Sequence, residues 1–208
     1  WPLSRKFGCE PAMAVDVLEH ALRLGLEPYG VSFHVGSQQR NQHAWDRALA
    51  SAASVFKECG ERGINLSMVN LESALTDGTC PDPQPKAYDF SAPAAAITAL
   101  RSAGVSLATE ANNHGEDCGP AGLQMSLAIR DQEHYAVLGI GQDAAQAFAP
   151  YQVTIKGQRI GTIAATQVID SDLQTSWTAT ASQPGLASAY DVADLVAAVE
   201  AARKVDDT

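Results

Sequence analysis

The stretch that decides the fold is Tyr29-Gly-Val-Ser-Phe-His-Val35, which is short, β-branched and bounded by glycine. These features predict a buried strand. The pattern of residues 42–62 then predicts a helix, and a second strand follows as Asn65-Leu-Ser-Met-Val-Asn-Leu71. Strands that alternate with helices are typical of a parallel sheet with helical crossovers. Residues 29–71 therefore predict the first unit of an α/β fold.

The same alternation extends in both directions from this unit. Residues 11–24 repeat apolar side chains at helical spacing, with Pro11 in the first turn and Gly25 as a stop. Further along, the pattern predicts helices at 94–103, 120–130 and 192–203, strands at 105–108 and 135–140, a hairpin of 151–155 with 159–166, and a loop at 76–89. We expect an α/β protein of alternating helices and strands, with a mainly parallel sheet and a β-hairpin in the C-terminal half. Ligands of such sheets bind beyond the carboxyl ends of the strands.

The charge of the chain is negative and lies in one part of it. Of 208 residues, positions 1–70 hold seven basic and seven acidic side chains, and positions 71–208 hold seven basic and seventeen acidic ones. A net charge of −10 argues against nucleic acid as a partner, because phosphate binding requires clustered Lys and Arg. An acidic surface instead suits a basic protein partner.

Composition also bears on location. No run approaches the roughly 20 apolar residues that cross a bilayer, so we expect no membrane segment. The four cysteines, Cys9, Cys59, Cys80 and Cys118, include no C-x-x-C pair and suggest neither a zinc knuckle nor a dense disulfide framework. We therefore expect a cytoplasmic protein. Its first residue is Trp1, so we also expect it to be part of a longer gene product or to follow a removed tag.

The first seventy residues carry one family resemblance. Arg5-Lys-Phe-Gly-Cys-Glu-Pro11, Ser32-Phe-His-Val-Gly-Ser37 and Leu66-Ser-Met-Val-Asn70 resemble the pyridoxal-phosphate (PLP) barrel of bacterial ornithine and lysine-type decarboxylases. The resemblance implies that His34 packs against the cofactor ring and that Ser37 helps to hold its phosphate. It also implies a Schiff-base lysine, expected upstream of residue 1, and a glycine-rich loop, where this chain has Leu71-Glu-Ser-Ala74. These departures argue against PLP, and the alternative is that His34 is hydrogen-bonded inside a packed layer.

Residues 70–208 carry a different resemblance. Asn70-Leu-Glu-Ser-Ala-Leu-Thr-Asp77, Tyr88-Asp-Phe-Ser-Ala-Pro93 and Glu110-Ala-Asn-Asn-His-Gly-Glu-Asp-Cys-Gly119 resemble the capsule-synthesis and polyglutamate-synthesis (CapA/PgsA-type) family. That family implies a metallophosphoesterase-like fold with metal ions over the strand ends, such as Mn²⁺ or another divalent metal.

The second resemblance assigns roles to four residues. It places Asn113 and His114 in the metal and substrate loop, His114 being the candidate catalytic residue. Glu72 falls at the neighbouring strand end, and Asp117 braces the loop. The candidate metal site that the resemblance implies therefore consists of Glu72, Asn113, His114 and Asp117. The family's first Asp motif and later His-containing strands find no counterpart in the chain. The alternative is structural: Asn112 and Asn113 shape a left-handed loop, and His114 and Asp117 cap the next helix.

Taken together, the patterns predict a chimera of residues 1–70 and 71–208, either as two segments or merged into one α/β domain, whose junction lies within a shared strand. A natural, a recombinant and a designed origin all stay open, as does the oligomeric state. Because each site lacks parts, we expect a non-catalytic protein. Three alternatives stay open: an acidic binding or inhibitory module for a basic protein, a residual metal-dependent phosphoesterase that uses Glu72, Asn113 and His114, and a PLP-binding remnant.

Overall fold

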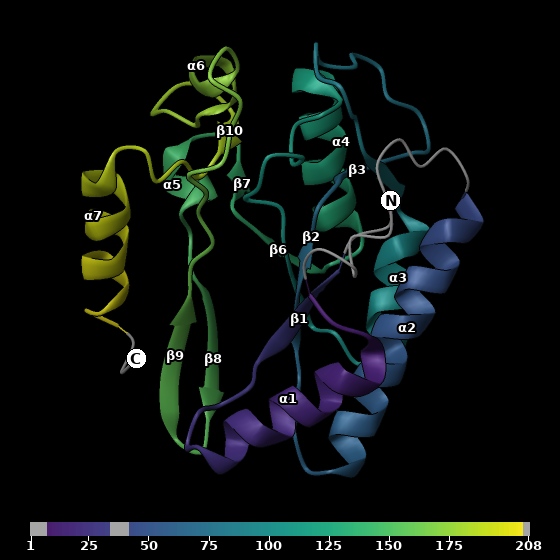
Figure 1. The fold of residues 1–208 in the computed structure, drawn as a ribbon. Coiled ribbons are helices and arrows are strands. Elements are labelled where there is room, and N and C mark those ends of the chain that lie inside the picture. The colour runs from purple at the N-terminus through teal and green to yellow at the C-terminus, as the bar shows by residue number, and fades with distance from the viewer. Residues whose placement is uncertain (1–7, 34–41, 206–208) are drawn as a thin grey trace.

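A four-stranded parallel sheet lies at the centre of the molecule in a computed structural model that describes residues 8–33 and 42–205 (Figure 1). Its strand order is β1-β2-β5-β6, and each neighbouring pair runs parallel. The helices are α1 (Pro11–Arg23), α2 (Gln42–Glu61), α3 (Ala95–Ser102), α4 (Gly119–Gln132), α5 (Ala144–Ala147), α6 (Gln174–Trp177) and α7 (Val192–Ala202). The strands are β1 (Gly30–Phe33), β2 (Met68–Leu71), β3 (Ala74–Thr76), β4 (Ser91–Pro93), β5 (Leu107–Thr109), β6 (Ala136–Leu138), β7 (Ile140–Gly141), β8 (Tyr151–Ile155), β9 (Gln158–Thr162) and β10 (Gly185–Leu186).

The expected α/β class and the C-terminal hairpin are confirmed. Strand β2 pairs with β1 on one side, where Val69 faces Val31, and with β5 on the other, where Val69 faces Ala108. One sheet therefore continues across residue 70, where the two resemblances meet. Strand β2 is the strand that joins them.

The hydrophobic core also spans both segments. Val15 of α1 and Phe56 of α2 are buried in the same cluster as Ile97, Leu123 and Trp177 from the later elements. Burial of each such side chain contributes roughly 1.5–3 kcal/mol. The helices α1 and α2 are therefore held by apolar contacts to the rest of the protein, as well as by the pairing of β1 with β2.

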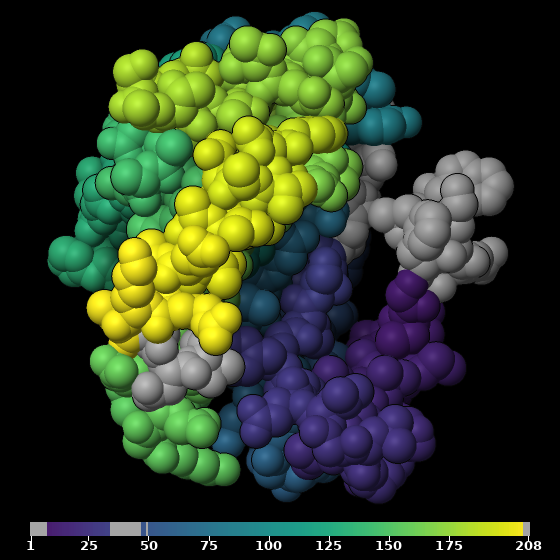
Figure 2. All heavy atoms as spheres, turned by 90° about the vertical axis from the view of Figure 1, so that its left-hand side faces the viewer, coloured from purple at the N-terminus to yellow at the C-terminus, as the bar shows by residue number. Residues whose placement is uncertain are grey.

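The elements are arranged in layers around the central sheet. Helices α2 and α3 lie on one side of it in Figure 1, and the β8–β9 hairpin and α7 lie on the other. In the space-filling view, α7 lies across the face of the molecule that is turned toward the reader (Figure 2). A second, small cluster that includes Phe148 and Ala187 anchors this helix through Leu195 and Ala198. None of the described helices is both long and apolar enough to cross a membrane.

Two local features differ from the sequence expectation. The strand expected at 135–140 is interrupted at Gly139, whose φ of 84° breaks it into β6 and β7. The loop expected at 76–89 is bounded by two short parallel strands, β3 and β4, in which Leu75 pairs with Ala92. Three-residue strands leave too short a pattern for periodicity to show.

Candidate functional site

The polar residues gather where β2 and β5 end. Asn70 and Thr109 face each other in the register of these strands, and the Thr109 hydroxyl donates to Asn70 Oδ1 at 3.0 Å. Asn112 Nδ2 donates to the same oxygen at 3.2 Å, and Asn70 Nδ2 donates to Glu72 Oε1 at 3.3 Å. The amide of Asn70 thus links Glu72 to the loop after β5. This is the carboxyl edge of the sheet, where α/β proteins bind ligands.

Asn112 fixes the loop that carries His114. Its Nδ2 also donates to the Leu71 carbonyl at 3.0 Å, and its Oδ1 accepts from the His114 backbone N–H at 2.9 Å. The left-handed loop proposed for Asn112 and Asn113 is wrong, because His134 and Lys156 are the non-glycine residues with positive φ in the described part of the chain. The side chain of Asn112 shapes the loop instead.

His114 and Asp117 form a buried pair. The imidazole Nδ1 lies 2.6 Å from Asp117 Oδ2, and the side chains are 11% and 0% exposed. Because a carboxylate only accepts, Nδ1 donates, and Nε2 is left as the second polar atom of the ring. The expected helix-capping role is wrong for both residues, since Cys118 is the N-cap residue of α4 and no side chain caps this end. The ring of Phe90 packs on the imidazole with a centroid distance of 4.1 Å.

Lys86 is the third member of this buried group. Its ammonium lies 2.5 Å from Asp117 Oδ1, donates to the Asn113 carbonyl and approaches His114 Nδ1 to 3.5 Å. The Phe90 N–H donates to Asp117 Oδ2 at 2.7 Å. Both carboxylate oxygens of Asp117 are therefore engaged by other groups of the protein.

The segment that carries Lys86 is tied to the site loop. A disulfide joins Cys80 to Cys118, and the Gln84 N–H donates to the Asp117 carbonyl at 3.0 Å. The sequence suggested no dense disulfide framework; this one pair is bonded, while Cys9 and Cys59 are free thiols. Disulfides persist in oxidising compartments. The cytoplasmic location stays a prediction, and this disulfide argues against it.

Three carboxyl groups near the loop carry buried oxygens that have no hydrogen-bond partner, namely those of Glu110, Glu116 and Asp89. Burial raises the pKa of Glu110 and of Glu116 to about 8. Ser126 lies beside Glu110, but its hydroxyl exchanges hydrogen bonds with the backbone of Leu75, which leaves both Glu110 oxygens unsatisfied. Burial and the charge of Asp117 raise the pKa of Asp89. The site is thus rich in acids that are short of partners.

The residues proposed as metal ligands do not fit a metal centre as they stand. Within residues 8–33 and 42–205, no three His, Cys, Asp or Glu side chains meet in a way that could hold an ion. Asn113 contributes its backbone carbonyl, to Lys86, and Glu72 is hydrogen-bonded to Asn70. His114 and Asp117 do meet, but each turns toward the other and toward Lys86.

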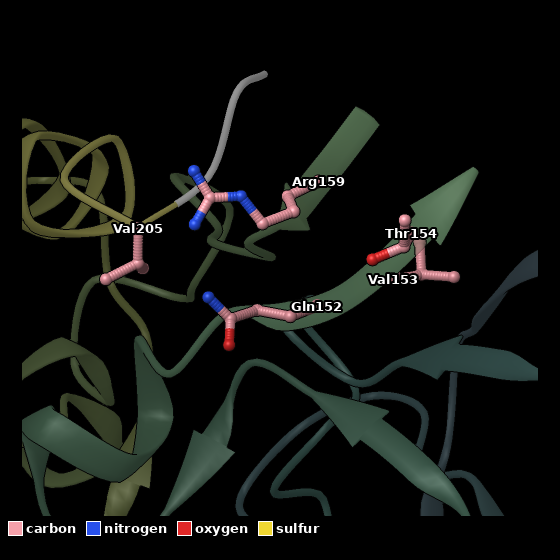
Figure 3. Close-up of a pocket in the computed structure, with 5 residues that line it drawn as sticks. All are labelled: Gln152, Val153, Thr154, Arg159 and Val205. Carbon is pink, nitrogen blue, oxygen red and sulfur yellow. The ribbon is translucent and has the colours of Figure 1, made fainter. Parts of the chain in front are cut away.

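A surface pocket lies elsewhere. It has a volume of about 310 Å³ and is lined by Gln152, Val153, Thr154, Arg159 and Val205, between the hairpin and the end of α7 (Figure 3). None of these residues belongs to the network of Asn70, Asn112, His114, Asp117 and Lys86, which we call the polar corner around His114. Because the polar network is at the strand ends, we place the candidate site there rather than in this pocket.

Two groups of known proteins match the chain, and their matches differ in extent. The chain is of the α/β class, and its polar residues lie beyond the carboxyl ends of parallel strands. The family model described as "Bacterial capsule synthesis protein PGA_cap" matches residues 30–208, and the chain belongs to this family. The match begins well before residue 70, so it includes the β1–α2–β2 unit.

Decarboxylases match a shorter part. The chain is 38% identical over 69 residues to a lysine/ornithine decarboxylase of Selenomonas ruminantium and 35% identical over 69 residues to antizyme inhibitor 2 of Xenopus laevis. These matches cover 33% of the chain, and 18% and 15% of the two relatives. The crystal structure of a Vibrio vulnificus lysine/ornithine decarboxylase with putrescine matches 33% of the chain and 19% of its own, at 36% identity and a TM-score of 0.31. Both resemblances seen in the sequence are confirmed, whereas His34 and Ser37 lie outside the described residues.

Proposed function

We propose that this chain is a hybrid member of the capsule-synthesis family that keeps the polar corner around His114 but turns over neither a phosphoester nor an amino acid. One observation carries the proposal. Asp117 is paired with Lys86, His114 and the Phe90 N–H, so a group that the family resemblance assigns to a metal loop is used inside the protein.

The decarboxylase-like segment, residues 1–70, also argues against turnover. The PLP barrel implies a glycine-rich loop after the strand that ends near Asn70, because backbone N–H groups must approach a phosphate. Here Leu71, Ser73 and Ala74 are buried, and Ala74 begins strand β3. The segment is packed into the protein rather than open to a phosphate. PLP binding through His34 and Ser37 is the alternative that this argument disfavours.

Activity assays test the proposal directly. The purified chain is incubated with p-nitrophenyl phosphate and with bis(p-nitrophenyl) phosphate, with and without Mn²⁺, and with lysine or ornithine plus PLP. We expect no turnover above buffer, and no difference from His114→Ala. Mn²⁺-dependent hydrolysis that His114→Ala abolishes would show that the residual phosphoesterase is correct. Release of CO₂ that depends on PLP would establish the decarboxylase alternative.

A second candidate function is binding to another protein, and it rests on α1. Five large apolar side chains of this helix and the turn after it are more than two-fifths exposed: Met13, Val17, Leu22, Leu24 and Leu26. Exposed apolar patches mark interaction sites. One of the relatives that shares a decarboxylase-like segment is named as an antizyme inhibitor.

The excess of acidic side chains in residues 71–208 adds a preference for a basic partner. We expect low-salt pull-downs to capture a basic protein, and Met13→Ser together with Val17→Ser to weaken the capture. The pair of substitutions Glu27→Gln and Glu61→Gln, which removes charge from the first half of the chain, serves as the matched control. Capture that both salt and the serine pair leave unchanged would rule out this surface.

A further inference from the structure

The surroundings of the Lys86 ammonium resemble those of a bound cation. It donates to the Asn113 carbonyl and to the Asp117 carboxylate, 2.5 Å away, and it lies 3.5 Å from His114 Nδ1, whose own hydrogen bond goes to Asp117. Its fourth neighbour is the ring of Trp177, whose centroid lies 4.8 Å from Nζ. The Lys86 side chain is 6% exposed. Carbonyl, carboxylate and imidazole groups are also the groups that bind divalent metals.

The charges around Lys86 favour a cation there. Asp117 is completely buried, so its carboxylate needs a positive partner inside the protein. Asp89 is within electrostatic reach of Asp117, Lys86 and His114, and its Oδ1 is buried without a hydrogen-bond partner. The negative charge available at this point therefore exceeds the single positive charge that Lys86 supplies.

Lys86 is also an isolated basic residue in the sequence. Lys86 is the sole Lys or Arg between Arg62 and Arg101, in a segment that contains Asp77, Asp82 and Asp89. The disulfide between Cys80 and Cys118 and the hydrogen bond from Gln84 hold this segment against the site loop. A disulfide and a hydrogen bond thus hold the segment that carries the ammonium against the site loop.

We infer that Lys86 is the resident cation of a latent metal site made by Asp117, His114 and the Asn113 carbonyl. While the ammonium is in place, it occupies this corner and the chain binds no divalent metal there. When the charge is removed, the same groups, with Asp89 nearby, take a divalent cation. This inference extends the proposed function, because a site that Lys86 already fills has no place for a catalytic metal.

The test is a calorimetric titration with Mn²⁺ of the wild-type chain, Lys86→Met and Lys57→Met. Lys57 is exposed on α2, so its substitution removes the same charge away from the site. We expect no stoichiometric binding to the wild type or to Lys57→Met, and one Mn²⁺ ion bound by Lys86→Met with an affinity at least about tenfold above any weak binding by the other two chains. Mn²⁺ should also raise the Tm of Lys86→Met alone, since binding to the native state stabilises it. Adding Asp117→Asn to Lys86→Met should abolish both effects.

Each outcome decides the inference. Stoichiometric binding of Mn²⁺ by the wild type that is lost in His114→Ala overturns it, as does a folded Lys86→Met that binds no metal. If Lys86→Met folds only when Mn²⁺ is present during refolding, the latent site is supported. If it fails to fold in either condition, Lys86→Gln replaces it, and the wild-type titration still stands as an independent test. Turnover of a phosphoester by a wild type that binds no metal would contradict the proposed function and leave the inference about Lys86 intact.

Discussion

Nδ1 of His114 lies 2.6 Å from Oδ2 of Asp117, three residues further along the same loop, and both side chains are largely shielded from water. The second oxygen of Asp117 holds Lys86, so one carboxylate fixes two neighbours. This arrangement joins the loop after β5 to the segment before β4.

The first prediction concerns Asp117 itself. In Asp117→Asn, the amide can present an N–H toward the Lys86 ammonium in place of an oxygen, and the lysine is left as a buried charge. Breaking a buried pair from one side costs about 3–5 kcal/mol. Urea unfolding should show a loss in this range, whereas Asp131→Asn, at a 67% exposed side chain, should change stability by less than about 1 kcal/mol. Equal effects of the two substitutions would mean that the Asp117 network adds little.

The second prediction concerns pH. The pKa of Glu110 is raised by burial from 4.5 to about 8 in the folded protein. The folded state therefore binds the proton more tightly than the unfolded state, so stability falls as pH rises from 4.5 to about 8 and then levels off. A shift of this size corresponds to roughly 5 kcal/mol as an upper limit.

Glu110→Leu should remove Glu110's part of this pH dependence. The variant replaces the two unpaired oxygens with a side chain suited to the core, so we expect it to be more stable than the wild type at pH 8 and similar to it near pH 4.5. Glu116 retains its own contribution, so the slope between these values should shrink without vanishing. The exposed Glu61→Gln is the control. An unchanged slope in Glu110→Leu would assign the effect to other groups.

The third prediction concerns the disulfide. Cys80 and Cys118 are 38 residues apart, and closing a loop of this length stabilises a protein by about 4 kcal/mol in the chain-entropy model. Cys80→Ser should lower the Tm and remove the sensitivity of the Tm to reductant. Cys9→Ser, which replaces an exposed free thiol, should do neither. A wild type whose melting does not respond to reductant would show that this bond contributes nothing to stability.

Much of the fold could be predicted because its signals are local. The apolar spacing of residues 11–24 and the β-branched runs at 29–35 and 65–71 led to α1, β1 and β2 within a few residues of their observed bounds. The break at Gly139 escaped prediction because it arises from the positive φ of one residue. A one-residue break cannot be seen in a hydrophobic pattern.

The site shows the same limit. The Asn112–Asn113–His114 motif and Asp117 were found from the sequence, and the structure brings His114 and Asp117 together. Lys86 was missed because it lies in a loop 31 residues before Asp117, and contacts over that distance leave no periodic signal. The one available clue was its isolation as a lone cation in an acidic segment. Glu72 reaches the network only through Asn70, so its role as a ligand stays a prediction.

The last prediction compares two glycines with the same backbone angle. Gly139 and Gly157 have φ values of 84° and 85°, a conformation that costs an L-residue about 1 kcal/mol or more. A Cβ on Gly139 would lie 2.3 Å from the Cβ of Ala111, in the loop that leads to His114, whereas a Cβ on Gly157 would meet nothing within 4 Å. Gly157→Ala should therefore show the cost of the angle alone. Gly139→Ala adds a clash, and overpacking costs about 1–3 kcal/mol more. Urea unfolding of the two variants measures that difference directly. If Gly139→Ala were no less stable than Gly157→Ala, the β6–β7 junction would not pack closely against the loop that carries His114.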